Sequence, residues 1–174
     1  EAILREKAAS EASNILGFSW EAKYHLNDNA LDGYPRLKII KLIEETKAKI
    51  KPVLVYTHSG SDLNIDHRMV FDAVLTAFRP QPGEKCCEIR LFETASATDY
   101  GHETLAGSFI PNLFIDISNF WEAKKAALNA YQVEMRSYPH SRSLTSLENR
   151  AKLRGNQVGL SMCEAFQVIR KIER

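Results

Sequence analysis

The chain has 174 residues, of which 44% are hydrophobic and 26% are charged, and its formal net charge is +1. This composition is typical of a soluble globular protein, and the length suits one domain with a buried core. The near-neutral charge argues against a nucleic-acid partner. No apolar run reaches the roughly 20 residues of a membrane-spanning helix. The three cysteines do not form a disulfide framework, so we expect a reducing, cytoplasmic environment.

Apolar residues recur with helical spacing in five parts of the chain. The pattern predicts helices over residues 1–16, 36–50, 68–78, 121–135 and 144–153. Gly17 is expected to cap the first helix, and Pro52 stands just beyond the second.

Short apolar runs predict strands over residues 53–56, 88–92, 112–117 and 165–169, with a weaker candidate at 23–26. The first run is apolar without alternation, which is typical of a strand buried on both faces of a parallel sheet. Strands that alternate with helices indicate an α/β sheet covered by helices. Ligands bind beyond the carboxyl ends of such strands, so the loop over 58–66 is the favoured position for a site.

Two histidines, His58 and His67, flank this loop. A hydrolytic zinc site needs about three histidine or carboxylate ligands and one open position for water. His67 stands at the junction of loop and helix, where a metal ligand or a purely structural histidine both fit. Asp66 beside it either supports a metal site or caps the helix without any metal. The spacing of the two histidines alone does not decide between these interpretations.

Five blocks occur along the chain in a recognisable order. They read VLVYTHSGSDLNIDHRMVFDAVLTAFRP, LFETASATDY, PNLFIDIS, YPHSRS and LRGNQVGLSMCEAF. In order and spacing they resemble the PIG-L/LmbE family of zinc-dependent N-acetylglucosamine deacetylases, over nearly the whole chain. The resemblance implies a three-layer αβα, Rossmann-like sheet and a single deacetylase domain over residues 1–174.

The resemblance also implies roles for residues of the first block. His67 matches a histidine of the family that binds zinc, and Asp66 matches an aspartate that supports the site. Asn64 stands where many members carry a histidine that assists the transition state. An imidazole acid is therefore excluded at that position, and His58 is the nearest alternative donor.

Three further residues match blocks that lie near the substrate in the family. His140 and Arg142 match a histidine and an arginine that are expected to line the sugar pocket, although a surface turn made by Pro139 is an equally good interpretation. Glu93 matches a block near the site, or it simply ends its strand.

One family motif is absent, because no H-P-D-D sequence occurs in the 174 residues. In the family this motif supplies a histidine and an aspartate as zinc ligands and a further aspartate as general base. Its absence predicts a chain that lacks the N-terminal β-α-β unit of the fold and is inactive by itself. The complete protein is expected to use Zn²⁺ to deacetylate an N-acetylated sugar or sugar-lipid, and a homo-oligomer is compatible with the resemblance. The alternative is a catalytically degenerate module that binds a glycan.

Overall fold

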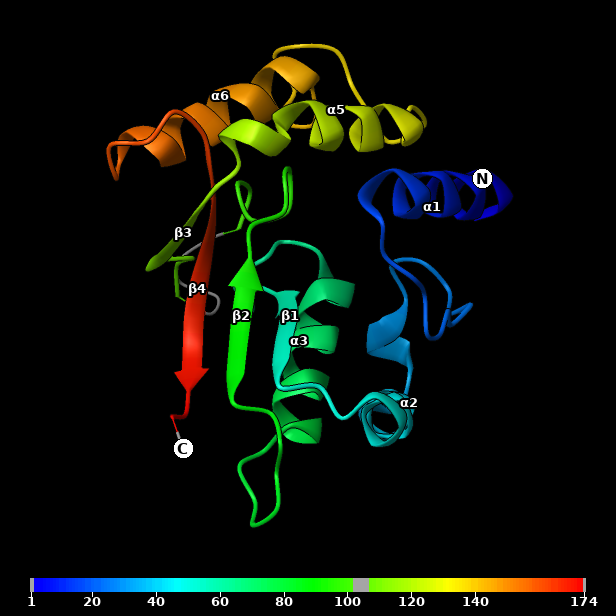
Figure 1. The fold of residues 1–174 in the computed structure, drawn as a ribbon. Helices are drawn as coiled ribbons and strands as arrows, with labels where there is room; N and C mark the ends of the chain where they lie inside the picture. The colour runs from blue at the N-terminus through cyan, green and yellow to red at the C-terminus, as the bar shows by residue number, and fades with distance from the viewer. Residues whose placement is uncertain (1, 102–106, 174) are drawn as a thin grey trace. The chain divides into compact units, whose positions relative to one another are not determined.

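The computed structural model of the chain describes residues 2–101 and 107–173 (Figure 1). All five predicted helices are present, and none in the described part is long and apolar enough to cross a membrane. The fourth ends at Ala130, five residues earlier than predicted. The helices are α1 (Ala2–Leu16), α2 (Arg36–Ile50), α3 (Ile65–Ala77), α5 (Trp121–Ala130) and α6 (Leu144–Asn156), with short 3-10 turns η1 (Leu31–Gly33) and η2 (Ser118–Phe120).

Four strands form one mixed sheet in the order β1-β2-β4-β3, which confirms the predicted α/β class. β1 pairs in parallel with β2, whereas β4 runs antiparallel to β2. The carboxyl ends of β1 and β2 therefore lie at the same edge of the sheet. The expectation that residues 53–56 are buried on both faces is wrong, because β1 lies at the end of the described sheet and Val53 and Tyr56 are exposed. The strands are β1 (Leu54–His58), β2 (Glu88–Phe92), β3 (Leu113–Asp116) and β4 (Cys163–Lys171).

The predicted strand over residues 23–26 is wrong, because this segment has no regular secondary structure. Its aromatic side chain is used in another way: the Tyr24 hydroxyl donates to the Leu42 carbonyl oxygen at 3.0 Å and lies 2.7 Å from the Thr46 hydroxyl. These contacts attach the segment to α2 through a side chain, with no strand partner for its backbone in the described structure.

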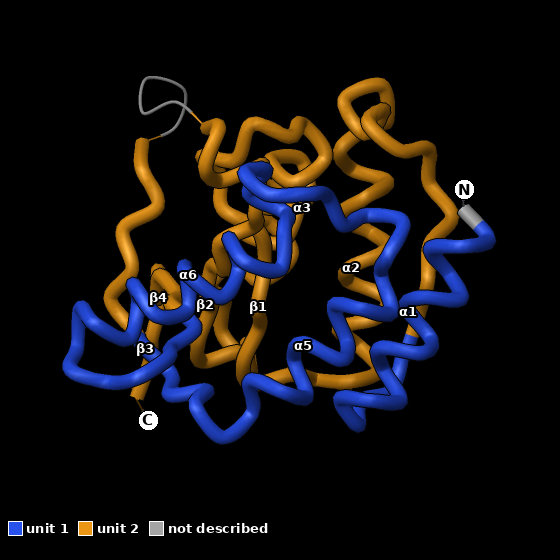
Figure 2. Tube along the Cα trace, turned by 90° about the horizontal axis from the view of Figure 1, so that it is seen from above, with its two compact units in different colours: residues 1–21, 114–164 blue, residues 22–113, 165–174 orange. Residues whose placement is uncertain are grey.

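The contacts of the chain divide it into two compact units, shown in different colours in Figure 2. Unit 1 comprises Glu1–Glu21 and Phe114–Glu164, and unit 2 comprises Ala22–Leu113 and Ala165–Arg174. The prediction of one deacetylase domain over residues 1–174 stays a prediction.

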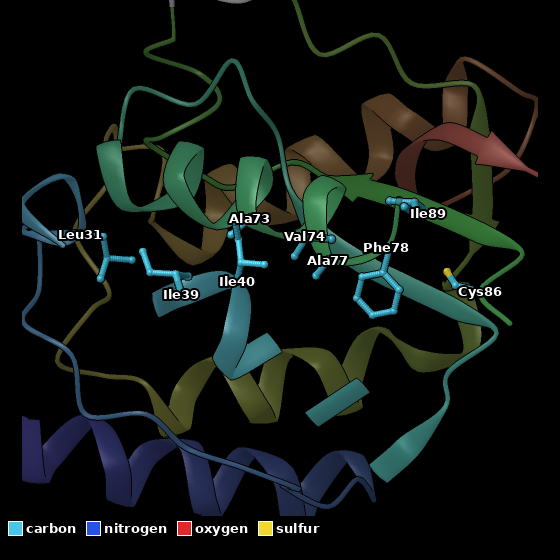
Figure 3. Packing of buried hydrophobic residues seen from close by; sticks show 9 residues of the cluster. All are labelled: Leu31, Ile39, Ile40, Ala73, Val74, Ala77, Phe78, Cys86 and Ile89. Atoms are coloured by element: carbon cyan, nitrogen blue, oxygen red, sulfur yellow. The ribbon is translucent and has the colours of Figure 1, made fainter. Parts of the chain in front are cut away.

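The core of unit 2 forms where α2 packs on α3 and α3 packs on β1. Its helical members recur at the spacing of one helix face, which is why the hydrophobic pattern of the sequence locates both helices. Ala73 and Ile89 are completely buried at the contact between α3 and the sheet. Nine buried residues make up the cluster (Figure 3): Leu31, Ile39, Ile40, Ala73, Val74, Ala77, Phe78, Cys86 and Ile89.

Unit 1 is a helical unit in which α1 packs against α5. A smaller buried cluster joins Ile117, Trp121 and Ala151. Gly17 ends α1 in the left-handed conformation (φ 73°), and its N–H donates to the Ser13 carbonyl oxygen at 2.9 Å. The predicted glycine cap is therefore confirmed.

Candidate functional site

The predicted loop leaves the carboxyl end of β1 and returns its polar side chains to that strand. His58 is the last residue of β1, and His67 lies in the first turn of α3. Their imidazole rings stack, with centroids 3.8 Å apart and planes inclined by 14°. His58 pairs in register with Phe92 of β2, so Glu93 follows at the same edge of the sheet. The structure thus gathers three of the predicted site residues at the edge where α/β sheets bind ligands.

A carboxylate that the sequence analysis did not identify lies beside His67. Asp62 is completely buried, and its Oδ2 lies 2.8 Å from His67 Nδ1. Its Oδ1 accepts a hydrogen bond from the Thr98 hydroxyl at 2.7 Å. Asp62 belongs to an irregular loop, so no periodic pattern marks it as buried; the one available signal is an acidic residue inside the block that resembles the family.

The loop after β1 is fixed by the loop after β2. The Leu63 N–H donates to the Ala97 carbonyl oxygen at 2.9 Å. The Cα of Gly101 comes so close to the chain that an added Cβ would lie 2.0 Å from the Ser61 carbonyl oxygen. A glycine is required at this close approach, since any other side chain would overlap the backbone of the first loop.

The N-cap of α3 is Asn64, which corrects the alternative of an N-cap at Asp66. The Asn64 side-chain oxygen accepts from the backbone N–H of Asp66 at 2.8 Å and of His67 at 3.4 Å. Asp66 instead accepts from the N–H groups of Asn29 (2.7 Å) and Leu31 (2.9 Å). The helix begins one residue before Asp66, which places its carboxylate beyond the cap position and against the segment that precedes α2. Catalytic roles for Asn64 and Asp66 stay predictions.

Three side chains of this region form a group able to ligate a metal. The donor atoms of His58, Asp62 and His67 all lie within 4.8 Å of one another. The lone pair of an imidazole nitrogen lies in the plane of its ring, so two nearly parallel stacked rings hold their lone pairs in separate, nearly parallel planes. In this geometry the two histidines do not converge on one ion. The donor types fit zinc, and of the two rings His67 is the one held by a carboxylate, as ligating histidines in proteins usually are.

Burial makes His58 a neutral residue. Desolvation and the neighbouring His67 lower the pKa of His58 from 6.5 to about 4, against the opposing effect of Asp62. Its Nδ1 is buried and has no hydrogen-bond partner among the described residues. At neutral pH His58 therefore offers this site an uncharged, unsatisfied polar atom, and a buried polar atom of this kind calls for a partner.

Of the other predicted substrate residues, His140 and Arg142 have partners within their own unit. Glu93 is half-buried directly after β2. His140 and Arg142 belong to unit 1, where His140 Nδ1 accepts from the Arg142 N–H at 3.0 Å. The Arg142 guanidinium donates to Glu134 at 2.7 Å. Both interpretations of this turn, sugar contact and plain surface turn, stay open.

Residues 1–78 match the family model of PIG-L, described as GlcNAc-PI de-N-acetylase. The resemblance inferred from the sequence is confirmed. The match spans α1, α2, β1 and α3, and so includes the whole loop that carries Asp62 and His67. A comparison with curated proteins gave no match.

Solved structures share the fold at low sequence identity. An N,N'-diacetylchitobiose deacetylase from Pyrococcus horikoshii aligns with a TM-score of 0.75 and 19% identity over 97% of this chain. The chain spans 64% of the length of that deacetylase. A zinc-inhibited teicoplanin deacetylase aligns with a TM-score of 0.67 and 16% identity, over 99% of this chain and 76% of that one. A 4-carboxy-2-hydroxymuconate hydratase from Pseudomonas putida aligns with a TM-score of 0.62 and 21% identity, over 98% of this chain and 74% of that one. One fold therefore serves both deacetylases and a hydratase, so function has to be argued from the site.

Proposed function

We propose that the complete protein removes the N-acetyl group from a GlcNAc-type sugar conjugate by metal-dependent hydrolysis, with Zn²⁺ as the metal. The observation that carries the proposal is His67 near the carboxyl end of β1, held by the buried Asp62 within a group of side chains able to ligate a metal. The PIG-L match over residues 1–78 supports the same reaction class, because it includes this loop. The substrate is an N-acetylated sugar or sugar-lipid, and the protein acts in the cytoplasm without a nucleic-acid partner.

In this proposal His67 ligates the metal, and the metal when bound polarises the amide carbonyl and activates water. His58, whose ring stacks on His67, is neutral at pH 7 and acts through hydrogen bonding to the reacting groups. Asn64 and Asp66 hold the first turn of α3, and thereby the His67 backbone, in place. Glu93, at the same edge of the sheet as His58, contacts the sugar. His140 and Arg142 of unit 1 are tested as sugar contacts by their effect on KM.

The remaining ligands and the general base would come from an H-P-D-D motif, which these 174 residues do not contain. A single histidine does not compete with water for zinc at useful affinity, so we expect no acetate release from the 174-residue chain alone. If the complete protein also lacks the motif, the alternative proposal applies: a module of the same fold that binds a glycan without hydrolysing it. Its homo-oligomeric state is open in either case.

The test is acetate release by the complete protein from N-acetylglucosamine conjugates, before and after metal removal by a chelator and re-addition of Zn²⁺. We expect activity to disappear with the metal and to return with it. His67→Ala should abolish the recovery, whereas His25→Ala, which changes an exposed histidine of the same unit, should keep it. Glycan binding without acetate release would favour the alternative, and full activity of His67→Ala would refute the ligand assignment.

A further inference from the structure

Asp62 is a buried acid whose two oxygens are both engaged by side chains. No part of the residue reaches solvent, while the His67 side chain keeps 19% of its surface exposed. One carboxylate oxygen meets His67 Nδ1 and the other accepts from Thr98. The Arg68 guanidinium adds a hydrogen bond to the Asp62 backbone carbonyl at 3.3 Å. A buried carboxylate is costly unless it is satisfied in this way, so the arrangement indicates a specific task.

The contact decides which nitrogen of His67 carries the proton. A carboxylate accepts hydrogen bonds, and a neutral imidazole has one N–H donor and one acceptor nitrogen. Since Nδ1 faces Asp62 at 2.8 Å, Nδ1 is the donor and Nε2 keeps its lone pair. Neutral imidazole with a lone pair on one nitrogen is the form that binds metal ions.

The hydroxyl of Thr98 is itself oriented by the backbone. The Thr94 N–H donates to Thr98 Oγ1 at 2.7 Å, and the Thr98 N–H donates to the Thr94 carbonyl oxygen at 2.8 Å. With one lone pair occupied by Thr94, the hydroxyl proton points to Asp62. The chain of hydrogen bonds therefore runs from the loop after β2, through Thr98 and Asp62, to the ring of His67.

We propose that Asp62 is a positioning residue for His67 and that Thr98 holds Asp62 in place for this purpose. The pair keeps the proton on His67 Nδ1 and presents Nε2 to a divalent cation. The stack on His58 fixes the plane of the His67 ring, and Asp62 selects its orientation within that plane, because a flipped ring would lose the contact of Nδ1 with Asp62. The inference rests on the proposed function in one respect, namely that the cation bound at Nε2 is the metal of the hydrolysis.

¹⁵N NMR of the complete protein, labelled at histidine, shows directly which ring nitrogen of His67 carries the proton. The sample contains no metal and is kept at about pH 8, where an unperturbed imidazole is neutral. The wild type should show His67 protonated on Nδ1. Thr98→Val, which keeps the side-chain shape but removes the hydroxyl, should shift this ring towards the other tautomer. Thr98→Ser, which restores the hydroxyl, should return it to the wild-type state.

Zn²⁺ affinity, measured by competition with a chromophoric chelator, is the second readout. Loss of an outer-shell partner weakens metal binding roughly 10- to 100-fold; we expect this loss in Asp62→Ala, a smaller loss in Thr98→Val, and wild-type affinity in Thr98→Ser. If Asp62→Ala does not fold, the test rests on the two Thr98 variants. Thermal melts of Thr98→Val and Thr98→Ser distinguish a change in the His67 tautomer from a loss of folding.

The outcomes separate the two proposals. A wild-type His67 protonated on Nε2, or a Thr98→Val protein with unchanged tautomer and unchanged Zn²⁺ affinity, would overturn the positioning role. If the tautomer behaves as expected and Zn²⁺ binds but acetate is not released, the positioning role stands and the deacetylase proposal fails.

Discussion

Two histidine-bearing segments of the molecule resemble family blocks, and the structure treats them differently. In unit 2, the loop over 58–67 brings His67 against Asp62, a completely buried carboxylate from the same loop. In unit 1, the side chains of the turn over 137–143 bond nearby groups of the same unit: the ring of His140 accepts from the Arg142 N–H, and Arg142 pairs with Glu134.

The hydrogen bonds of the loop over 58–67 build a site, whereas those of the turn over 137–143 stabilise the turn. A side-chain hydrogen bond to the backbone of the same turn stabilises the turn and is common where no ligand binds. A buried side-chain pair, held in turn by a residue of another loop, is costly unless fully satisfied and is typical of a built site. The comparison predicts that changes at the loop over 58–67 affect chemistry, whereas changes at the turn over 137–143 affect affinity or folding.

The largest expected effect is a kinetic difference between substitutions of His67 and of His140 in the complete protein. His67→Ala should lower kcat/KM more than about 100-fold, beyond the usual cost of losing an outer-shell partner. His140→Ala should raise KM with kcat nearly unchanged, since a contact made equally in ground and transition states affects binding alone. Steady-state rates of acetate release give both values. A His140→Ala protein that loses kcat as severely as His67→Ala would remove the distinction.

Two closely packed glycines, Gly101 of unit 2 and Gly155 of unit 1, test the comparison of the two units. An added Cβ would lie 2.0 Å from the Ser61 carbonyl oxygen at Gly101 and 2.5 Å from the Leu160 carbonyl oxygen at Gly155. Each change to alanine should cost about 1–3 kcal/mol of unfolding free energy or more, because the backbone has to shift.

In the complete protein, only Gly101→Ala should also weaken Zn²⁺ binding, since Ser61 precedes Asp62 in the loop over 58–67. Gly33→Ala is the control, because an added Cβ there meets nothing within 4 Å. Urea unfolding and zinc competition measure the two effects. Equal losses of Zn²⁺ affinity in Gly101→Ala and Gly155→Ala would show that the site does not depend on this close approach.

The pH dependence of stability tests the burial of His58. Its pKa in the folded protein is lowered to about 4 from 6.5, first by desolvation and then by His67. The unfolded chain therefore binds a proton at a higher pH than the folded one, so the contribution is fully present above pH 6.5 and is lost as the pH falls towards 4. Between pH 7 and pH 5 we expect a loss of about 2 kcal/mol of unfolding free energy.

The measurement is urea unfolding at the two pH values for the wild type and for His58→Gln, which does not titrate. The variant should lack this part of the pH dependence. Identical slopes for the two proteins would show that His58 is more accessible to water than its position at the end of β1 indicates.

Much of the fold follows from local patterns in the sequence. α2 and β2 have the predicted bounds, Arg36–Ile50 and Glu88–Phe92, because a helical stripe or an alternating run is read directly from neighbouring residues. α5 ends early because residues 131–135 close into turns, with the N–H of Glu134 and of Met135 donating to the Tyr131 carbonyl oxygen. Local hydrophobic spacing does not reveal this change of hydrogen bonding.

The site was predicted in part, for a related reason. His67 was identified by the family block and His58 by its proximity in sequence. The rule that ligands bind beyond the carboxyl ends of the strands of an α/β sheet located their loop. Asp62 and Thr98 were missed, because the bond between them joins positions 36 residues apart. Such a contact depends on the register of β1 with β2, which the sequence of either strand alone does not determine.

The smallest expected effect concerns the caps of the two helices that follow these segments. Asn64 caps α3 and Ser143 caps α6, each through a side-chain oxygen that accepts backbone N–H groups. Changing either to alanine should cost about 1 kcal/mol. Ser143→Ala should change thermal stability alone, whereas Asn64→Ala should also reduce Zn²⁺ affinity by a small factor, because one of the N–H groups that Asn64 caps belongs to His67.

Asn64→Asp separates the cap from a catalytic role for Asn64 in the complete protein. The aspartate keeps the accepting oxygen, so stability and Zn²⁺ affinity should both return to nearly the wild-type values. If capping is the whole task of Asn64, acetate release returns with them. If stability returns but the rate stays low, the amide group itself takes part in the reaction, and the first turn of α3 supplies a second chemical group beside His67.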